Sequence, residues 1–169
     1  VFTPSIDEMY RTGFATMVHV AGPAVPLEGE TRPGHFDGVA TVVTKLLLQA
    51  QPDRAYFGQK DAQQTAVVRR LVEDLDLRVD IVVCPPVRQA DGLAISTRNA
   101  YLTRPQRRAA PLLYRALAAT RDRYRSGGQD RQQLEAGCRA LLAVEPAVDA
   151  IDYVAVVDGD TMEPWDGHG

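Results

Sequence analysis

Two short apolar segments on either side of an amphipathic helix constrain the fold more than any other feature of this sequence. The segments RAYFG (54–58) and RVDIVVC (78–84) are rich in the aromatic and β-branched residues that favour strands. Between them, one mostly apolar helical face is formed by Gln64, Val67, Val68, Leu71, Val72 and Leu75. Two strands connected through a helix pair in parallel, so this stretch predicts a βαβ unit and an α/β fold.

The residues ahead of this unit extend the same pattern. ATMVHVAG (15–22) predicts another strand, and VATVVTKLLLQ (39–49) places its apolar residues at helical spacing. A loop rich in Pro and Gly, PLEGETRPGHFDG (26–38), separates them. The first half of the chain is therefore expected to alternate strands and helices.

The pattern changes near residue 100. Thr103 and Gln106 have the spacing of a capping box, which predicts a helix from there to about residue 125. SGGQD (126–130) then predicts a break, followed by a second helix to about residue 144 and a strand at IDYVAVV (151–157). We expect one domain over residues 1–99 and a smaller α+β domain over residues 100–169.

Charge and cysteine content exclude several classes of function. A net charge of −3 argues against nucleic acid as the main partner, because such surfaces are normally basic. Cys84 and Cys138 are isolated, with no CxxC and no histidine pair, so neither a zinc site nor a metal held directly by the protein is predicted. The lack of a disulfide pattern favours a reducing cytoplasm. No apolar run approaches the about 20 residues that span a bilayer, so no membrane-spanning segment is predicted.

A lysine stands at the turn between the first strand and the helix of the βαβ unit. Of 19 basic residues only Lys45 and Lys60 are lysines, and Lys60 lies in Gly58-Gln59-Lys60-Asp61. Ligands of open α/β sheets bind beyond the carboxyl ends of the strands, where helix N-termini and a lysine favour phosphate. The alternative is that this turn only starts the helix, with Asp61 and Gln64 as a second capping box.

Two further loops carry polar side chains suited to a nucleotide or an acid. Ser96, Thr97 and Arg98 offer two hydroxyls and a guanidinium, which suit phosphate oxygens. The alternative is a turn in which the hydroxyls bond the local backbone and Arg98 pairs with an acidic neighbour. Glu28, Arg32 and His35 fall in the loop before the helix at 39–49, where they are either binding residues or ordinary surface residues.

Three motifs, LEGxxRPGHFxGVxTVVxKL, PDxxYFGQKDAQQ and DGLAISTRNAYLTxxQR, occur in this order over residues 27–107. In these motifs and their order, the chain closely resembles the pantothenate synthetase family, the pantoate–β-alanine ligases, over roughly residues 2–117. The resemblance implies a partial Rossmann-like sheet of the nucleotidyltransferase type, followed by part of the α+β C-terminal domain. It also implies the reaction: ATP and pantoate form pantoyl-adenylate with Mg²⁺, and β-alanine then displaces AMP to give pantothenate.

The resemblance implies a role for each candidate residue. ATP is expected to contact Gly58, Gln59, Lys60, Asp61, Val87, Ile95, Ser96, Thr97 and Arg98, with Lys60, Ser96, Thr97 and Arg98 acting on the reacting phosphates. Pantoate is expected to contact Glu28, Arg32, His35 and Gln64. The resemblance further implies a homodimer.

The sequence departs from the family pattern in two ways. Gln59 and Thr97 stand where many relatives have Glu and Ser, and both keep a hydrogen-bonding group. The HxGH signature that grips the phosphates in the family has no counterpart in this sequence, so we expect an internal fragment that is inactive alone. The alternatives are another nucleotidyltransferase of this fold, or a non-catalytic nucleotide-binding or dimerisation module.

Overall fold

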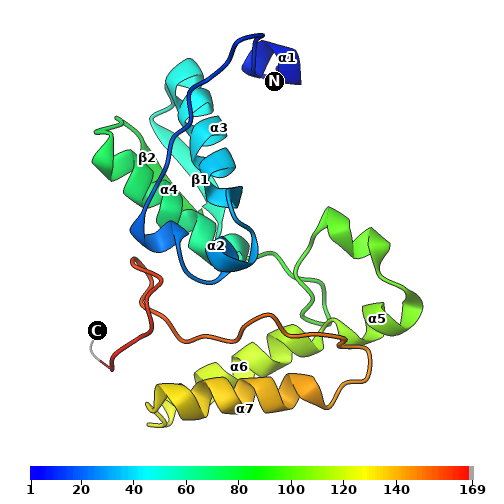
Figure 1. Cartoon of the computed structure of the whole chain (residues 1–169). Coiled ribbons are helices and arrows are strands. Elements are labelled where there is room, and N and C mark those ends of the chain that lie inside the picture. The colour runs from blue at the N-terminus through cyan, green and yellow to red at the C-terminus, as the bar shows by residue number, and fades with distance from the viewer. Residues whose placement is uncertain (168–169) are drawn as a thin grey trace. The chain divides into compact units, whose positions relative to one another are not determined.

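The predicted βαβ unit forms as expected. The computed structural model describes residues 1–167; the last two residues of the predicted C-terminal domain lie outside this range. Strand β1 (Arg54–Gly58) runs parallel to β2 (Asp80–Cys84), with Gly58 opposite Cys84 at their carboxyl ends. The 3₁₀ turn η2 (Gln59–Asp61) and helix α4 (Ala62–Asp74) connect them (Figure 1).

A small core holds α4 against helix α3 (His35–Ala50). The core contains Val20, Phe36, Ala40, Val67 and Leu71, all almost fully buried. These residues recur at helical spacing within α3 and α4, so burying the shared apolar faces explains the packing of the two helices. The predicted helices on both sides of β1 are therefore confirmed.

The strand predicted at residues 15–22 is wrong. Residues 15–21 belong to no helix or strand, Gly22 begins a 3₁₀ turn, and among residues 1–167 the sheet contains β1 and β2 alone. The amide of Val18 donates instead to Oγ1 of Thr41 on α3, at 2.9 Å, and Val20 enters the core. Only Val20 of this segment is buried, and a strand also needs a neighbour to share its hydrogen bonds.

Short elements surround this unit. Helix α1 (Ile6–Met9) begins with a capping box formed by Ser5 and Glu8. The 3₁₀ turn η1 (Gly22–Ala24) precedes the predicted Pro- and Gly-rich loop. Helix α2 (Glu28–Thr31) lies within that loop and leads into α3.

The helices after residue 100 carry one surprise. The Thr103–Gln106 capping box is present, but the single predicted helix is two: α5 (Arg104–Ala109) and α6 (Leu112–Arg125). Pro111 explains the break, since it has no N–H to donate to the preceding turn. The predicted break at 126–130 is confirmed, and α7 (Arg131–Ala143) follows and lies beside α6 (Figure 1).

The strand predicted at residues 151–157 is also wrong. Ile151 and Val154 pack against the cluster that Ala116, Cys138 and Leu142 form between α6 and α7. The amide of Val156 donates to Oε1 of Glu135 at 3.0 Å instead of to another strand. Only an isolated antiparallel bridge between Val157 and Pro164 resembles strand pairing here.

The chain divides into two compact units, Val1–Cys84 and Pro85–Gly169. The boundary predicted near residue 99 lies within the second unit. The assignment of one domain to residues 1–99 and another to residues 100–169 stays a prediction. Over the described residues, no helix is both long and apolar enough to cross a membrane.

Candidate functional site

The turn from β1 to α4 presents Lys60 to solvent. Its Nζ lies 3.4 Å from Oδ1 of Asp61, and both side chains are more than one third exposed. An ion pair this exposed contributes at most about 1 kcal/mol, so Lys60 is free to move to another anion. Asp61 precedes α4 without a side-chain hydrogen bond to it, so the alternative capping box of Asp61 and Gln64 is wrong.

Nothing within the described chain requires glycine at position 58. Gly58 has an ordinary φ of −80°, and a Cβ added there meets no atom within 4 Å. Glycine at such a position is explained neither by a left-handed backbone nor by close packing. The open space above Gly58 fits the close approach of a ligand to the backbone, as a phosphate-binding turn requires.

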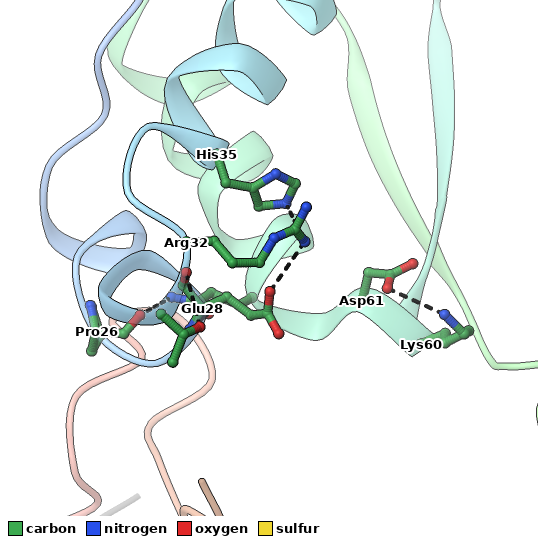
Figure 2. Close-up of polar contacts among 8 residues, drawn as sticks. Pro26, Glu28, Arg32, His35, Lys60 and Asp61 are labelled. Atoms are coloured by element: carbon green, nitrogen blue, oxygen red, sulfur yellow. Dashed lines mark hydrogen bonds and ion pairs between the residues drawn. The ribbon is translucent and has the colours of Figure 1, made fainter. Parts of the chain in front are cut away.

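Arg32 lies in contact with both Glu28 and His35, the three residues predicted from one loop. The guanidinium of Arg32 is 3.3 Å from Oε2 of Glu28 and 3.4 Å from Nε2 of His35. Figure 2 shows Arg32 between the other two side chains, with Lys60 and Asp61 in the same view. Helix α2 carries Glu28 and α3 begins at His35, so two short helical turns orient the group.

A residue that was not predicted connects this loop to α4. Gln63 is buried, and its side-chain amide bonds to the main chain of Pro23, Pro26 and Glu28. Its neighbour Gln64, the predicted pantoate ligand, is only partly buried in the first turn of α4. The missed signal was position: residue 63 stands four residues before Val67 on the buried face of the helix.

In the second unit, Ser96 and Arg98 lie in a local turn. Oγ of Ser96 accepts from the amide of Arg98 at 3.2 Å and starts the 3₁₀ helix η3 (Thr97–Tyr101). This confirms the local-turn alternative for Ser96 alone of the two hydroxyls. The acidic partner that this alternative gives Arg98 is wrong, because Arg98 forms no ion pair with any residue of the described range 1–167. Thr97 and Arg98 are both exposed.

Val87 and Ile95 lie side by side on a short hairpin, residues 87–95. The amide of Ile95 donates to the carbonyl of Val87 at 2.9 Å, and Arg88 bridges to Ala94. Val87 is 70% exposed and Ile95 58% exposed. Two adjacent exposed apolar side chains beside Ser96 offer a flat surface of the kind that adenine packs against.

The hairpin is anchored on α5 and α6. Arg88 stacks on the ring of Tyr114, with the guanidinium carbon 4.0 Å from the ring centre. Gly92 has a φ of +93°, and a Cβ there would lie 2.7 Å from Tyr114, so only glycine fits. Arg107 on α5 holds Asp91 with an N–O distance of 2.7 Å.

Hydrogen bonding sets the protonation of Asp91. The side chain of Arg107 and, second, the backbone amide of Leu93 lower the pKa of the Asp91 carboxyl below its ordinary value. Both donors bind the charged form. The carboxylate is therefore ionised throughout the neutral range and keeps Arg107 attached to the hairpin.

Within each unit the structure brings predicted residues together. The first unit joins the Gly58–Asp61 turn to the Glu28–Arg32–His35 group through α4, and the second joins Val87 and Ile95 to Ser96. The union of both groups in a single ATP site stays a prediction. Among the described residues, no three His, Cys, Asp or Glu side chains cluster as metal ligands.

Comparisons with known proteins show which family the chain resembles over its length. The model of the family described as pantoate-beta-alanine ligase matches residues 1–168. The pantothenate synthetase of Roseiflexus sp. (strain RS-1) is 54% identical over 162 residues, which cover 96% of this chain and 58% of that protein. That of Chloroflexus aurantiacus (strain J-10-fl) is 53% identical over 169 residues, or 100% of this chain and 60% of the relative.

Solved structures give the same picture. The crystal structure of pantothenate synthetase from Thermus thermophilus matches with a TM-score of 0.90 and 48% identity, covering 96% of this chain and 58% of that one. The pantoate-beta-alanine ligase of Francisella tularensis, complexed with beta-gamma ATP and beta-alanine, matches with a TM-score of 0.62 and 34% identity over 80% of this chain and 50% of that one. This chain thus spans less than two thirds of the length of these relatives.

Proposed function

Because this chain belongs to the pantoate-beta-alanine ligase family, we propose that it forms part of the site that joins pantoate to β-alanine at the expense of ATP. One observation carries the proposal. The turn that presents Lys60 and the group of Glu28, Arg32 and His35 lie at the same end of α4, where Gln63 links the loop to the helix. A phosphate site and an acid site at one helix N-terminus are what adenylation of a carboxylate requires.

In the first step a carboxylate oxygen of pantoate attacks the α-phosphorus of ATP. The bond to the β-phosphate breaks, pyrophosphate leaves and pantoyl-adenylate forms. The ammonium group of Lys60 interacts with the negative charge that develops on the α-phosphate. This interaction stabilises the transition state more than the ground state. No general base is needed, because a carboxylic acid is already ionised at neutral pH.

In the second step the amine nitrogen of β-alanine attacks the acyl carbon of the adenylate. The new C–N bond replaces the C–O bond to AMP, AMP leaves, and the nitrogen loses a proton. The role of this chain is to hold the adenylate, with no side chain assigned as the base for the amine. The β-alanine bound to the Francisella tularensis relative favours this amine as the second substrate.

Two loops divide the substrate contacts. Arg32, held by Glu28 and His35, and Gln64 on α4 are assigned to pantoate, since a fixed guanidinium and an amide suit a hydroxy acid. On the nucleotide side, Val87 and Ile95 are assigned to adenine. Phosphate contacts are assigned to Gly58, Gln59, Lys60, Asp61, Ser96, Thr97 and Arg98.

Mg²⁺ fits this site as a companion of the nucleotide. The ion usually binds substrate phosphates and keeps several waters, so the nucleotide can carry it without a direct protein ligand. When bound, Mg²⁺ neutralises phosphate charge. A homodimer in the cytoplasm completes the proposal, and analytical ultracentrifugation of the chain tests the dimer directly.

Calorimetric titration of the chain with Mg-ATP, and then with pantoate, tests the proposed function. We expect saturable ATP binding that Lys60→Ala weakens about tenfold to a hundredfold, since a hydrogen bond to a charged group contributes about 1.5–3 kcal/mol. Lys45→Ala is the matched control, because Lys45 lies 4.9 Å over the ring of Phe14 on another part of the unit. Equal ATP affinity in the wild type and the Lys60→Ala variant would rule out the assigned role of this turn.

A further inference from the structure

The buried side-chain amide of Gln63 makes three hydrogen bonds, all to the main chain of residues 23–28. Its Nε2 donates to the carbonyl of Pro23 at 2.9 Å and to that of Pro26 at 2.6 Å. Its Oε1 accepts from the amide of Glu28 at 3.1 Å. With 7% of its surface exposed, Gln63 has exchanged water for three main-chain contacts more than 30 residues away in sequence.

The loop at these contacts has a strained backbone. Leu27 lies between Pro26 and Glu28 with φ 57° and ψ −113°, a conformation that non-glycine residues rarely adopt. Such a conformation persists only where the surroundings hold it. The side chain of Gln63 spans Leu27, since it bonds the carbonyl before it and the amide after it.

The loop is also packed closely on itself. A Cβ added at Gly29 would lie 2.0 Å from the carbonyl oxygen of Ala24, so the backbone passes within direct contact of η1. The strained residue therefore lies in a turn with no room to relax toward η1. The three bonds from Gln63 fix both the bend at Leu27 and the point where α2 begins.

The bend sets the direction of Glu28. Its backbone amide is held by Gln63, while its carboxylate holds Arg32, which in turn reaches His35. A shift of the Glu28 backbone moves the whole group. Gln63 itself is buried beneath the loop and so acts on this group only through the main chain.

We infer that Gln63 is a positioning residue: its amide clamps the strained Leu27 turn and thereby places Glu28, Arg32 and His35 for pantoate. The assignment to pantoate rests on the proposed function. The clamp itself does not, because it is a property of the folded chain. Gln63→Leu, which has similar size but no polar atoms, removes all three bonds.

Two readouts test the clamp. Hydrogen exchange reports the amide of Glu28, and we expect it to exchange at least about fivefold faster in Gln63→Leu, since one hydrogen bond contributes roughly 1 kcal/mol. Calorimetry with pantoate on the chain saturated with Mg-ATP is expected to show about tenfold weaker pantoate binding, with ATP affinity changed less than about twofold. Adding Leu27→Gly to Gln63→Leu should restore part of the pantoate affinity, because glycine adopts the turn without strain.

Val68→Ala is the control for general destabilisation. Val68 is fully buried on α4, but its side chain has no polar atom and so cannot hydrogen-bond the loop. Unchanged exchange of the Glu28 amide in Gln63→Leu, or an equal loss of pantoate affinity in Val68→Ala, would overturn the inference. If the wild-type chain binds no pantoate, the proposed function fails, and exchange of the Glu28 amide still decides whether Gln63 is a clamp.

Discussion

At the scale of single residues, we expect glycine at position 58 to be needed for ATP binding but not for folding. Because its backbone is ordinary and the space around it is open, Gly58→Ala should fold normally and gain about 0.4–1 kcal/mol in free energy of unfolding. The same methyl group should weaken Mg-ATP binding about tenfold by keeping phosphate from the backbone. Chemical denaturation and calorimetry measure the two effects. The control is Gly38→Ala within α3, where an added Cβ also meets no atom within 4 Å; it should stabilise the fold similarly and leave ATP affinity unchanged. Equal weakening of ATP binding in Gly38→Ala would contradict the prediction.

At the scale of elements, the attachment of the hairpin 87–95 to α5 depends on pH. The pKa of Asp91 is lowered in the folded chain by Arg107, so the attachment is at full strength above the ordinary carboxyl pKa and is lost as pH falls through the lowered folded value. Below that pH we expect the amide hydrogen of Leu93 to exchange with solvent faster than its intrinsic, pH-dependent rate alone would allow. In Asp91→Asn the exchange should be fast already at neutral pH. Asp158→Asn serves as control, since backbone amides of Thr161 and Asp160 lower its pKa too, but it lies outside the hairpin. An acid transition at Leu93 that persists in Asp91→Asn would contradict the assignment.

At the scale of the whole molecule, each unit has its own buried cluster and should lose stability on its own. Leu71→Ala leaves a cavity in the buried cluster of Val1–Cys84, and Leu142→Ala leaves one in the buried cluster of Pro85–Gly169. Each should cost about 2–5 kcal/mol. Hydrogen exchange should speed up mainly within the mutated unit, and the two costs should add within about 0.5 kcal/mol in the double variant. Faster exchange spread evenly over residues 1–167 in either single variant would instead indicate one cooperative unit.

Local sequence signals predicted the elements whose stability is local. The βαβ unit and the capping box at Thr103 follow from periodicity and side-chain spacing within about 30 residues. The strands expected at 15–22 and 151–157 failed because strand pairing depends on a neighbour, which no local pattern supplies. The break before Pro111 was readable from the proline alone.

The site followed the same division. Glu28, Arg32 and His35 are three and four residues apart, so one loop brings them together without help from distant sequence. The turn at Lys60 was likewise readable from a strand, a glycine and a helix. Gln63 was missed because its partners, Pro23, Pro26 and Glu28, lie 35–40 residues earlier in the chain.

The contacts of Gln63 bear on how this loop can change over evolution or in the laboratory. Every bond that it makes ends on a main-chain atom, at positions 23, 26 and 28. Main-chain atoms are the same for almost all amino acids, so the side chains at positions 28, 32 and 35 can be exchanged without removing a bond to Gln63. The residues proposed to contact the substrate can therefore change without changing the residue that shapes the loop. A library that varies positions 28, 32 and 35 but leaves 63 fixed is the economical way to seek acceptance of other hydroxy acids.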